Sequence, residues 1–238
     1  MNDFTGEFFG TAVLILLGDG VVAGVLLNRS KAQNGGWIVV TAGWAFAVMA
    51  GIYTAREVGS PGFINPVGPI AGLVTGNLHA EQALYMIVGE LLGAFVGAVL
   101  VWLHYLPHWS VTNDSGLKLG VFCTSPAIRN PPANLLAEAI ATFVLVFVGT
   151  AIVEKGFSKG TLTAPLLGAL VWGIGLSLGG TTGYAINPAR DLAPRIAHAL
   201  LPIPGKGPSD WGYAWIPVVG PIVGGIAGAL VAKAVLLG

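Results

Sequence analysis

Apolar residues form long runs in this chain, and short polar breaks separate them. A run of about 20 residues is long enough for a helix to cross the ~30 Å hydrocarbon core of a bilayer. Six stretches have this length or nearly so, namely residues 4–27, 37–54, 83–104, 133–153, 162–180 and 214–237. The main polar breaks fall at 29–34, 108–120 and 154–159. The pattern predicts an all-α membrane protein with six transmembrane helices.

The two halves of the chain repeat each other at an offset of 131 residues. The run GEFFGTAVLILLG at 6–18 aligns with AEAIATFVLVFVG at 137–149. The same offset relates three further glycines of each half, Gly89, Gly93 and Gly97 with Gly220, Gly224 and Gly228. Each half holds three predicted spans, so the second half should lie inverted in the membrane relative to the first.

This repeat predicts the domain organisation. We expect a single membrane domain over 1–238, with a first repeat of about 1–106, a linker of about 107–130 and a second repeat of about 131–238. The inverted 3+3 arrangement has its pseudo-twofold axis in the membrane plane.

Two Asn-Pro pairs occur at corresponding places in the halves, in FINPVGP at 63–69 and in AINPARD at 185–191. Asn is a preferred helix N-cap and Pro a preferred first helical residue, so each pair predicts a helix start. The helix from Pro66 to about Val74 would span only about 13 Å at 1.5 Å per residue. We therefore predict two re-entrant half-helices that enter from opposite sides and meet near the bilayer centre, lining a watery cavity.

Composition agrees with a membrane location. Hydrophobic residues make up 54% of the chain and charged residues 9%, whereas soluble domains contain about 25% charged residues. The formal net charge is zero, and without a long basic run the chain has no candidate nucleic-acid surface. The single Cys123 excludes an intramolecular disulfide. The first apolar run begins at Phe4 with no basic segment before it, so we expect a retained membrane helix rather than a cleaved signal.

The polar residues inside the apolar runs are the candidate functional groups. The side-chain NH₂ groups of Asn65 and Asn187, together with the positive ends of both half-helices, would face the central space. Such a site accepts water or a small alcohol by its oxygen and repels cations. A charge such as Arg190 is costly inside a membrane unless it faces a cavity. The alternative for Arg190 is a structural ion pair with Asp191 or another intramembrane acid.

Four further acids lie within the apolar runs. Glu7 and Glu138 are related by the repeat, and we expect them to hold the two re-entrant loops by accepting backbone N–H groups. Asp19 and Glu90 have no acid at the repeat-related positions, and the sequence assigns them no role. No cluster of His, Cys or acidic residues has metal-ligand spacing, and no nucleophile motif is visible, so we expect no cofactor, no metal and no enzymatic activity.

The six spans in an inverted repeat, with INPV at 64–67 and INPAR at 186–190, resemble the aquaporin, or major intrinsic protein, family over nearly the whole chain. NPARDLAPR at 187–195 is similar to the glycerol-facilitator branch, which carries an acid at the position of Asp191. The resemblance implies a passive channel for glycerol and other small neutral solutes, with water, that excludes protons and ions. A water-selective aquaporin and an ion-coupled inverted-repeat transporter that titrates Glu7, Glu90 or Glu138 remain alternatives.

The resemblance also implies roles for individual residues. The paired motif consists of Asn65, Pro66, Val67, Asn187, Pro188 and Ala189. The selectivity filter consists of Trp44, Gly175, Tyr184 and Arg190; the glycine opposite the tryptophan is expected to leave room. The pore carbonyls belong to Pro61, Gly62, Phe63, Ile64, Gly183, Tyr184, Ala185 and Ile186. Asp191 joins Glu7 and Glu138 as a loop-supporting acid.

Four features depart from the family pattern: Val67 replaces the usual Ala, Phe63 the usual His and Tyr184 the usual Phe, and Gly68-Pro69 is unusual. These departures leave the range of solutes open, with dihydroxyacetone, urea and lactic acid as further candidates beside glycerol and water. By resemblance alone, we expect a homotetramer in the bilayer of the cell membrane, with both termini cytoplasmic. The basic residues divide almost evenly between the two sides, so charge does not set the orientation.

Overall fold

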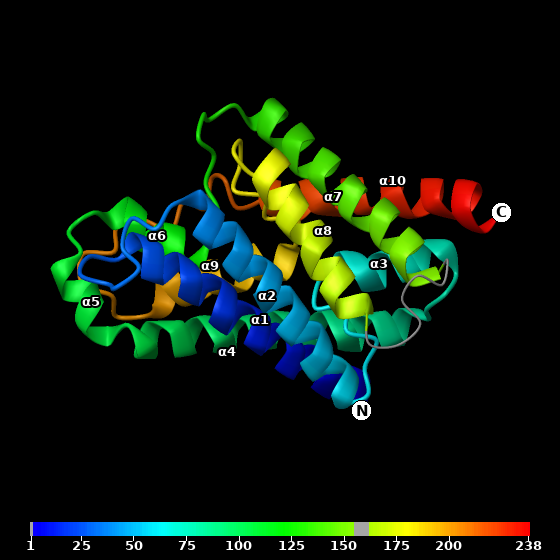
Figure 1. The fold of residues 1–238 in the computed structure, drawn as a ribbon, viewed down its shortest axis with the longest axis horizontal. Helices are drawn as coiled ribbons and strands as arrows, with labels where there is room; N and C mark the ends of the chain where they lie inside the picture. Colours follow the sequence, from blue (N-terminus) through cyan, green and yellow to red (C-terminus); the bar gives the residue numbers. More distant parts are fainter. Residues whose placement is uncertain (1, 155–161) are drawn as a thin grey trace.

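The computed structural model describes residues 2–154 and 162–238, and all regular structure in this part of the chain is helical (Figure 1). Five helices are long and apolar enough to cross a membrane. They are α1 Asn2–Leu26, α2 Trp37–Glu57, α4 Ala80–His104, α7 Pro131–Glu154 and α10 Ile216–Ala232, which the π-helical turn η1 Lys233–Leu237 continues. Most of the polar break predicted at 154–159 lies outside the described residues. The sixth predicted span is the shorter apolar helix α8 Thr163–Leu178.

The first and third long helices of each half pack along their glycines. Gly93 of α4 faces the Phe8 carbonyl of α1, and Gly224 of α10 faces the Ala139 carbonyl of α7. An added Cβ would lie 2.2 Å from the first oxygen and 2.0 Å from the second, so a larger residue does not fit either position. The neighbouring glycines repeat the pattern, with Gly89 on Phe4, Gly97 on Ala12, Gly220 on Leu135 and Gly228 on Phe143. Small residues thus allow the close backbone approach typical of membrane helices.

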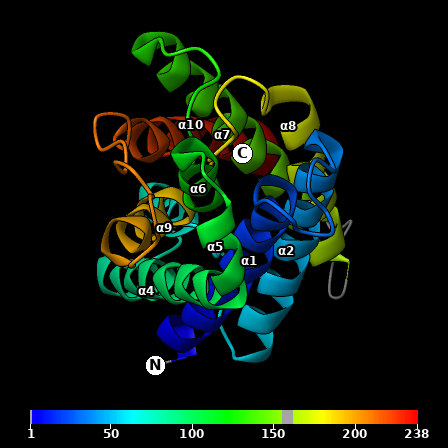
Figure 2. The ribbon, with the colours of Figure 1, turned by 90° about the vertical axis from the view of Figure 1, so that its left-hand side faces the viewer.

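Two short helices lie between the long ones (Figures 1 and 2). They are α3 Val67–Thr75 and α9 Pro188–Leu200, and each packs against the third long helix of the other half, α3 on α10 and α9 on α4. Helix α9 begins at Pro188 as predicted, and α3 begins at Val67, one residue after Pro66. Both are too short to cross a bilayer at 1.5 Å per residue.

Each half-helix ends beside a lysine. The Lys206 ammonium donates to the carbonyls of His198, Ala199 and Leu201 at 2.7–2.8 Å, at the end of α9. The Lys233 ammonium donates to the Thr75 carbonyl at 2.8 Å, at the end of α3. A cation at these ends satisfies carbonyls that have no helical partner and complements the negative end of the helix dipole.

The segment predicted as a linker contains two further helices, α5 Leu106–Val111 and α6 Ser115–Phe122. Asp114 caps α6 by accepting from the backbone N–H groups of Gly116 and Leu117. Helix α6 packs against α1 and α9, so the linker covers one end of the bundle (Figure 2).

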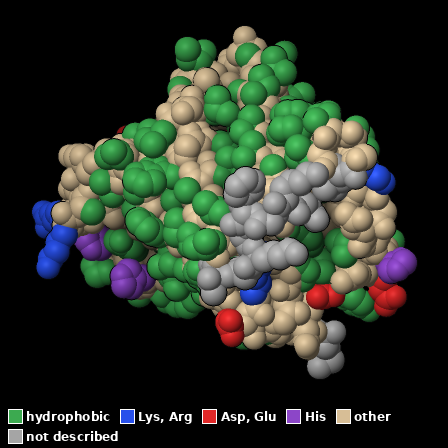
Figure 3. Space-filling view, turned by 45° about the vertical axis from the view of Figure 1, so that its right-hand side comes forward, with side chains coloured by type: hydrophobic (Ala, Val, Ile, Leu, Met, Phe, Trp, Pro, Cys, Tyr) green, Lys and Arg blue, Asp and Glu red, His purple; other side chains and the backbone are tan. Residues whose placement is uncertain are grey.

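The outer surface is strongly apolar. Hydrophobic side chains cover much of the face that the grey atoms leave visible in Figure 3, whereas the visible Lys, Arg, Asp, Glu and His side chains lie at its two ends and along its lower part. Large exposed apolar residues come from several long helices, including Phe46, Leu84, Leu136 and Ile140. An apolar face with polar ends matches the lipid core and its interfaces. The chain is an integral membrane protein.

Candidate functional site

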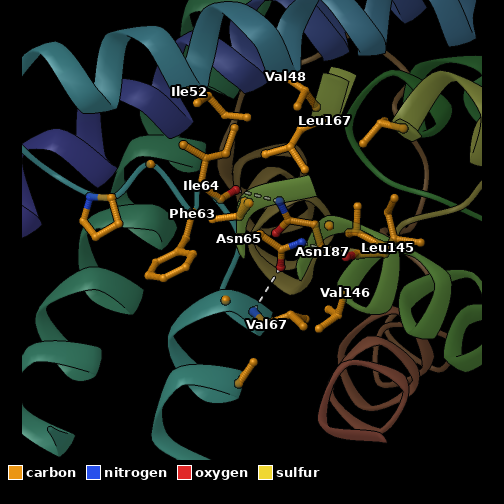
Figure 4. Close-up of a pocket in the computed structure, with 18 of the residues that line it drawn as sticks. Val48, Ile52, Phe63, Ile64, Asn65, Val67, Leu145, Val146, Leu167 and Asn187 are labelled. Atoms are coloured by element: carbon orange, nitrogen blue, oxygen red, sulfur yellow. Dashed lines mark hydrogen bonds between the residues drawn. The ribbon is translucent and has the colours of Figure 1, made fainter. Parts of the chain in front are cut away.

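A cavity of about 490 Å³ enters the bundle from one end and reaches its centre. Arg56, Thr75 and Val153, near the ends of α2, α3 and α7, line it on one side, and Trp44 and Arg190 line it deep inside. Apolar side chains make up much of the wall, and Figure 4 shows Val48, Ile52, Leu145, Val146 and Leu167 around the two asparagines. The cavity therefore has an apolar wall with a few polar groups at defined places, as solute sites usually do.

The two predicted motif asparagines lie together at the centre of this cavity and tie the two re-entrant loops to each other. The Asn65 Nδ2 group donates to the Ile186 carbonyl, and the Asn187 Nδ2 group donates to the Ile64 carbonyl, both at 2.8 Å. Figure 4 draws the second of these bonds. Ile64 and Ile186 both have a left-handed backbone, with φ of 48° and 44°. The sequence analysis expected the NH₂ groups to face open space; in the structure one N–H of each amide is used by the opposite loop.

Asn187 caps α9 as predicted, whereas Asn65 lies one residue before Pro66, the N-cap of α3. Asn187 Oδ1 accepts from the backbone N–H groups of Ala189 and Arg190 at 3.0 and 3.2 Å. Asn65 Oδ1 accepts from the Val67 N–H at 3.1 Å. With its oxygen bound and one N–H used, each amide keeps one N–H donor for a solute.

Glu7 holds the first loop. Its Oε1 accepts from Ser60 Oγ at 2.6 Å and from the N–H groups of Gly62 and Phe63 at 3.0 Å, and its Oε2 accepts from the Ile64 N–H at 2.6 Å. The carboxyl group is fully buried. Several charge-assisted hydrogen bonds of this kind compensate a carboxylate for its burial.

Glu138 does the same in the second loop. Its Oε1 accepts from Thr182 Oγ1 at 2.6 Å and from the Ala185 N–H at 3.0 Å, and its Oε2 accepts from the Ile186 N–H at 2.9 Å. The N–H of one residue and the C=O of the residue before it point in opposite directions across a trans peptide. Because the loop N–H groups face the glutamates, the carbonyls of 61–63 and 184–185 face away from them.

Glu90, to which the sequence analysis gave no role, adds a hydrogen bond at the same place. Its Oε1 accepts from the Asn65 N–H at 3.0 Å, and the side chain is fully buried on α4. The second loop has no such acid, because the position related to Glu90 is Pro221. The repeat therefore gave no signal for it.

Arg190 and Trp44 meet at the deep end of the cavity. The guanidinium carbon lies 4.2 Å from the centre of the Trp44 ring, which is a cation–π distance. Arg190 Nη1 lies 3.4 Å from the Phe122 carbonyl and 3.7 Å from Asp19 Oδ1. The ion pair raised as an alternative for Arg190 thus exists, and its acid is Asp19 rather than Asp191. At 3.7 Å the pair is longer than a hydrogen bond, and both Asp19 oxygens lack a hydrogen-bond partner among the described residues.

Tyr184 closes the third side of this constriction. Its ring meets the Trp37 ring edge-on at 5.7 Å, and the Trp37 indole N–H donates to the Gly175 carbonyl at 3.0 Å. Among the described residues the buried Tyr184 hydroxyl has no hydrogen-bond partner. A Cβ at Gly175 would lie 2.8 Å from Tyr184 Cζ, and Gly175 itself does not line the cavity. The expected room at Gly175 is therefore occupied by the Tyr184 ring.

Asp191 fastens the linker to α9. Its Oδ2 accepts from the N–H and the hydroxyl of Thr124, both at 2.7 Å, and its Oδ1 pairs with Arg195 at 2.7 Å. Arg195 also donates to the carbonyls of Thr124 and Ser209 at 2.9 Å. The sequence analysis named Asp191 but not Thr124 or Arg195, although the i,i+4 spacing of Asp191 and Arg195 on a helix is a visible signal.

A second hollow lies next to Gly183. It has a volume of about 420 Å³ and is lined by Trp37, Ser125, Pro126, Ala127, Gly179, Gly180 and Gly183. Gly183 of this second hollow precedes Tyr184, which lines the first cavity. Over residues 2–154 and 162–238, no three His, Cys, Asp or Glu side chains are grouped as a metal site.

Fold and site together define the class of protein: a membrane helix bundle in which two half-helices meet at a cavity within one chain. The chain belongs to the major intrinsic protein family, whose family model matches residues 1–232. The family consists of channels, so the chain is a channel and not an enzyme.

Similar proteins agree with this assignment. Glycerol uptake facilitator protein 3 of Lactiplantibacillus plantarum is 53% identical and covers 94% of this chain and 93% of its own length. A probable glycerol uptake facilitator protein of Thermotoga maritima is also 53% identical, over 96% and 97%. The X-ray structure of the aquaglyceroporin from Plasmodium falciparum superimposes with a TM-score of 0.88 at 28% identity, over 99% and 96% of the two chains. The predicted aquaporin-like fold is confirmed.

Proposed function

We propose that this protein is a passive channel for glycerol and other small neutral solutes, with water, and that it excludes protons and ions. The observation that carries the proposal is the deep end of the cavity, which we take as the constriction of the pathway: Trp44 and Tyr184 provide an apolar corner there and Arg190 provides hydrogen-bond donors. A polyol has one CH face and one OH face, and this constriction matches both. The glycerol uptake facilitators among the similar proteins support the choice of glycerol.

A polyol in the pathway exchanges hydrogen bonds with water for hydrogen bonds with the channel. Its hydroxyls accept from Arg190 and from the remaining N–H of Asn65 and Asn187, and they donate to the loop carbonyls of 61–63 and 184–185. Its carbons lie against the aromatic rings and the aliphatic wall. This compensation keeps the cost of dehydration low, because moving an unpaired polar group from water to a site with apolar walls costs free energy.

Ions lack this compensation. The Arg190 charge and the positive ends of α3 and α9 raise the energy of a cation along the pathway. An anion would exchange its hydration shell for a wall made mostly of apolar side chains, which costs free energy. A neutral solute avoids both penalties.

Several finer features belong to the same proposal. Dihydroxyacetone, urea and undissociated lactic acid are small neutral solutes and further candidate permeants.

We place the two repeats at about 1–106 and 131–238 of a single membrane domain, in the cell membrane, with cytoplasmic termini. The apolar outer faces allow self-association, and we propose the homotetramer of the family resemblance.

Uptake kinetics test the channel against the ion-coupled transporter. Initial uptake of labelled glycerol into proteoliposomes should rise linearly with glycerol concentration and stay the same with or without a proton or sodium gradient. Uptake that saturates and depends on a gradient would instead assign Glu7, Glu90 or Glu138 to ion coupling.

Gly175→His tests the constriction. A histidine here collides with the Tyr184 ring, since the added Cβ alone lies 2.8 Å from Tyr184 Cζ. We expect reduced glycerol flux with water flux retained, in proteoliposomes normalised for the amount of protein. Unchanged glycerol flux would show that the filter lies elsewhere.

The water-selective alternative rests on Tyr184, whose ring fills the space at Gly175. It predicts fast water flux and negligible glycerol flux in the unmodified protein.

A further inference from the structure

We propose that Gly225, which lies on α10 outside the pore lining, sets the width of the pore at the first Asn-Pro motif by accommodating the side chain of Val67. The proposal rests on the glycerol conduction proposed above and names a residue that determines its selectivity.

Val67 occupies the place where α10 has no side chain. It is the first residue of α3, it lines the cavity beside Asn65, and it is 1% exposed (Figure 4). A Cβ on Gly225 would lie 2.1 Å from Val67 Cγ1 and 3.6 Å from Val146 Cγ2. One methyl group of Val67 therefore fills the volume that any side chain at 225 would need.

The second Asn-Pro motif offers an internal comparison. The residue after Asn187-Pro188 is Ala189, which corresponds to Val67, and the offset of 131 relates Gly225 to Ala94. Both alanines are fully buried. The pair at the second motif thus consists of two alanines, Ala189 of the second half and Ala94 of the first, where the pair at the first motif consists of Val67 of the first half and Gly225 of the second. The larger residue at the motif coincides with the smaller residue on the long helix.

Val67 cannot easily turn aside. A β-branched residue in a helix has one strongly preferred χ1 rotamer, and close-packed interiors respond to even one extra methylene. With a methyl group at 225, the Val67 side chain or α10 itself has to move. The cavity is the open space next to Val67, so the displaced valine narrows the pathway beside Asn65. Water, being smaller than glycerol, should be affected less.

Four proteins test this coupling: the wild type, Gly225→Ala, Val67→Ala and the double variant Val67→Ala/Gly225→Ala, which reproduces the alanine pair of the second motif. In proteoliposomes we expect Gly225→Ala to lower the ratio of glycerol to water permeability roughly tenfold, the low end of what one methyl group does in an apolar pocket. The double variant should recover the ratio. Gly173→Ala is the matched control, because an added Cβ there has nothing within 4 Å.

Two results would overturn the proposal: an unchanged ratio in Gly225→Ala, or a double variant that inserts normally but keeps the low ratio. If Gly225→Ala fails to insert, recovery of insertion and flux in the double variant supports the coupling, and its failure rejects it. A wild type that conducts no glycerol refutes the proposed function instead. The contact between Val67 and residue 225 is then tested by the unfolding temperatures of the same four proteins. If the two residues contact each other, the changes in the two single variants do not add up to the change in the double variant.

Discussion

At the scale of single residues, this protein keeps acids inside a membrane by satisfying their oxygens. Glu7 accepts four hydrogen bonds and Glu138 three, all from the re-entrant loops. An ionisable group within a membrane is costly and is retained where it has a partner or faces a cavity. These bonds also bear on function, because loop N–H groups that face the glutamates leave the carbonyls of 61–63 and 184–185 facing away from them.

Glu138→Gln should weaken the second loop. The amide replaces one acceptor oxygen with an NH₂ donor that faces other donors, and a hydrogen bond to a charged group contributes about 1.5–3 kcal/mol. We expect a lower unfolding temperature in detergent and reduced glycerol uptake. The matched control is Glu81→Gln on the same type of helix, since Glu81 is exposed and accepts a hydrogen bond from the Tyr85 hydroxyl at 3.3 Å. Equal unfolding temperatures for the two variants would contradict the supporting role of Glu138.

Sequence reasoning found the site residues that carry a local or repeated signal. The Asn-Pro pairs, Arg190 and the two glutamates stand out because they are polar inside apolar runs and most of them occur twice. It gave no role to Asp19 or Glu90, whose partners Arg190 and Asn65 are distant in the chain and reach them only through helix packing. For the same reason it could not foresee that each Asn amide bonds to the opposite loop, or that Gly225 accommodates Val67.

At the scale of helices, glycines set how closely the long helices approach. They lie in two glycine seams, the contact of α1 with α4 and the contact of α7 with α10, whose glycines and carbonyls correspond at the offset of 131. Helix limits were well predicted from apolar length, with α3 beginning one residue late. The helices α5 and α6 were not predicted because they lie in and around the polar break at 108–120, although Asp114 is an N-cap signal for α6.

Gly224→Ala should disrupt the α7–α10 seam. The new Cβ would lie 2.0 Å from the Ala139 carbonyl oxygen, which is backbone and cannot rotate away, so the helices must separate. Overpacking of this kind costs roughly 1–3 kcal/mol. We expect a lower unfolding temperature and less protein in the membrane fraction, while Gly173→Ala on α8 should behave like the wild type. Wild-type stability for Gly224→Ala would show that α10 is not held by this seam.

At the scale of the whole molecule, the two inverted halves bring two loops, two half-helices and two asparagines to one point. The cavity extends past both asparagines to Trp44, Tyr184 and Arg190. We therefore expect glycerol to cross this protein by passive diffusion.

Light scattering of proteoliposomes after an osmotic shock tests whether glycerol crosses the protein by passive diffusion. A shock with an impermeant sugar should cause rapid shrinkage, and a shock with glycerol should cause shrinkage followed by rapid re-swelling that neither saturates nor depends on an ion gradient. Rapid shrinkage without re-swelling in glycerol would contradict the account, because it would mean that Tyr184 and Val67 narrow the pathway to the width of water.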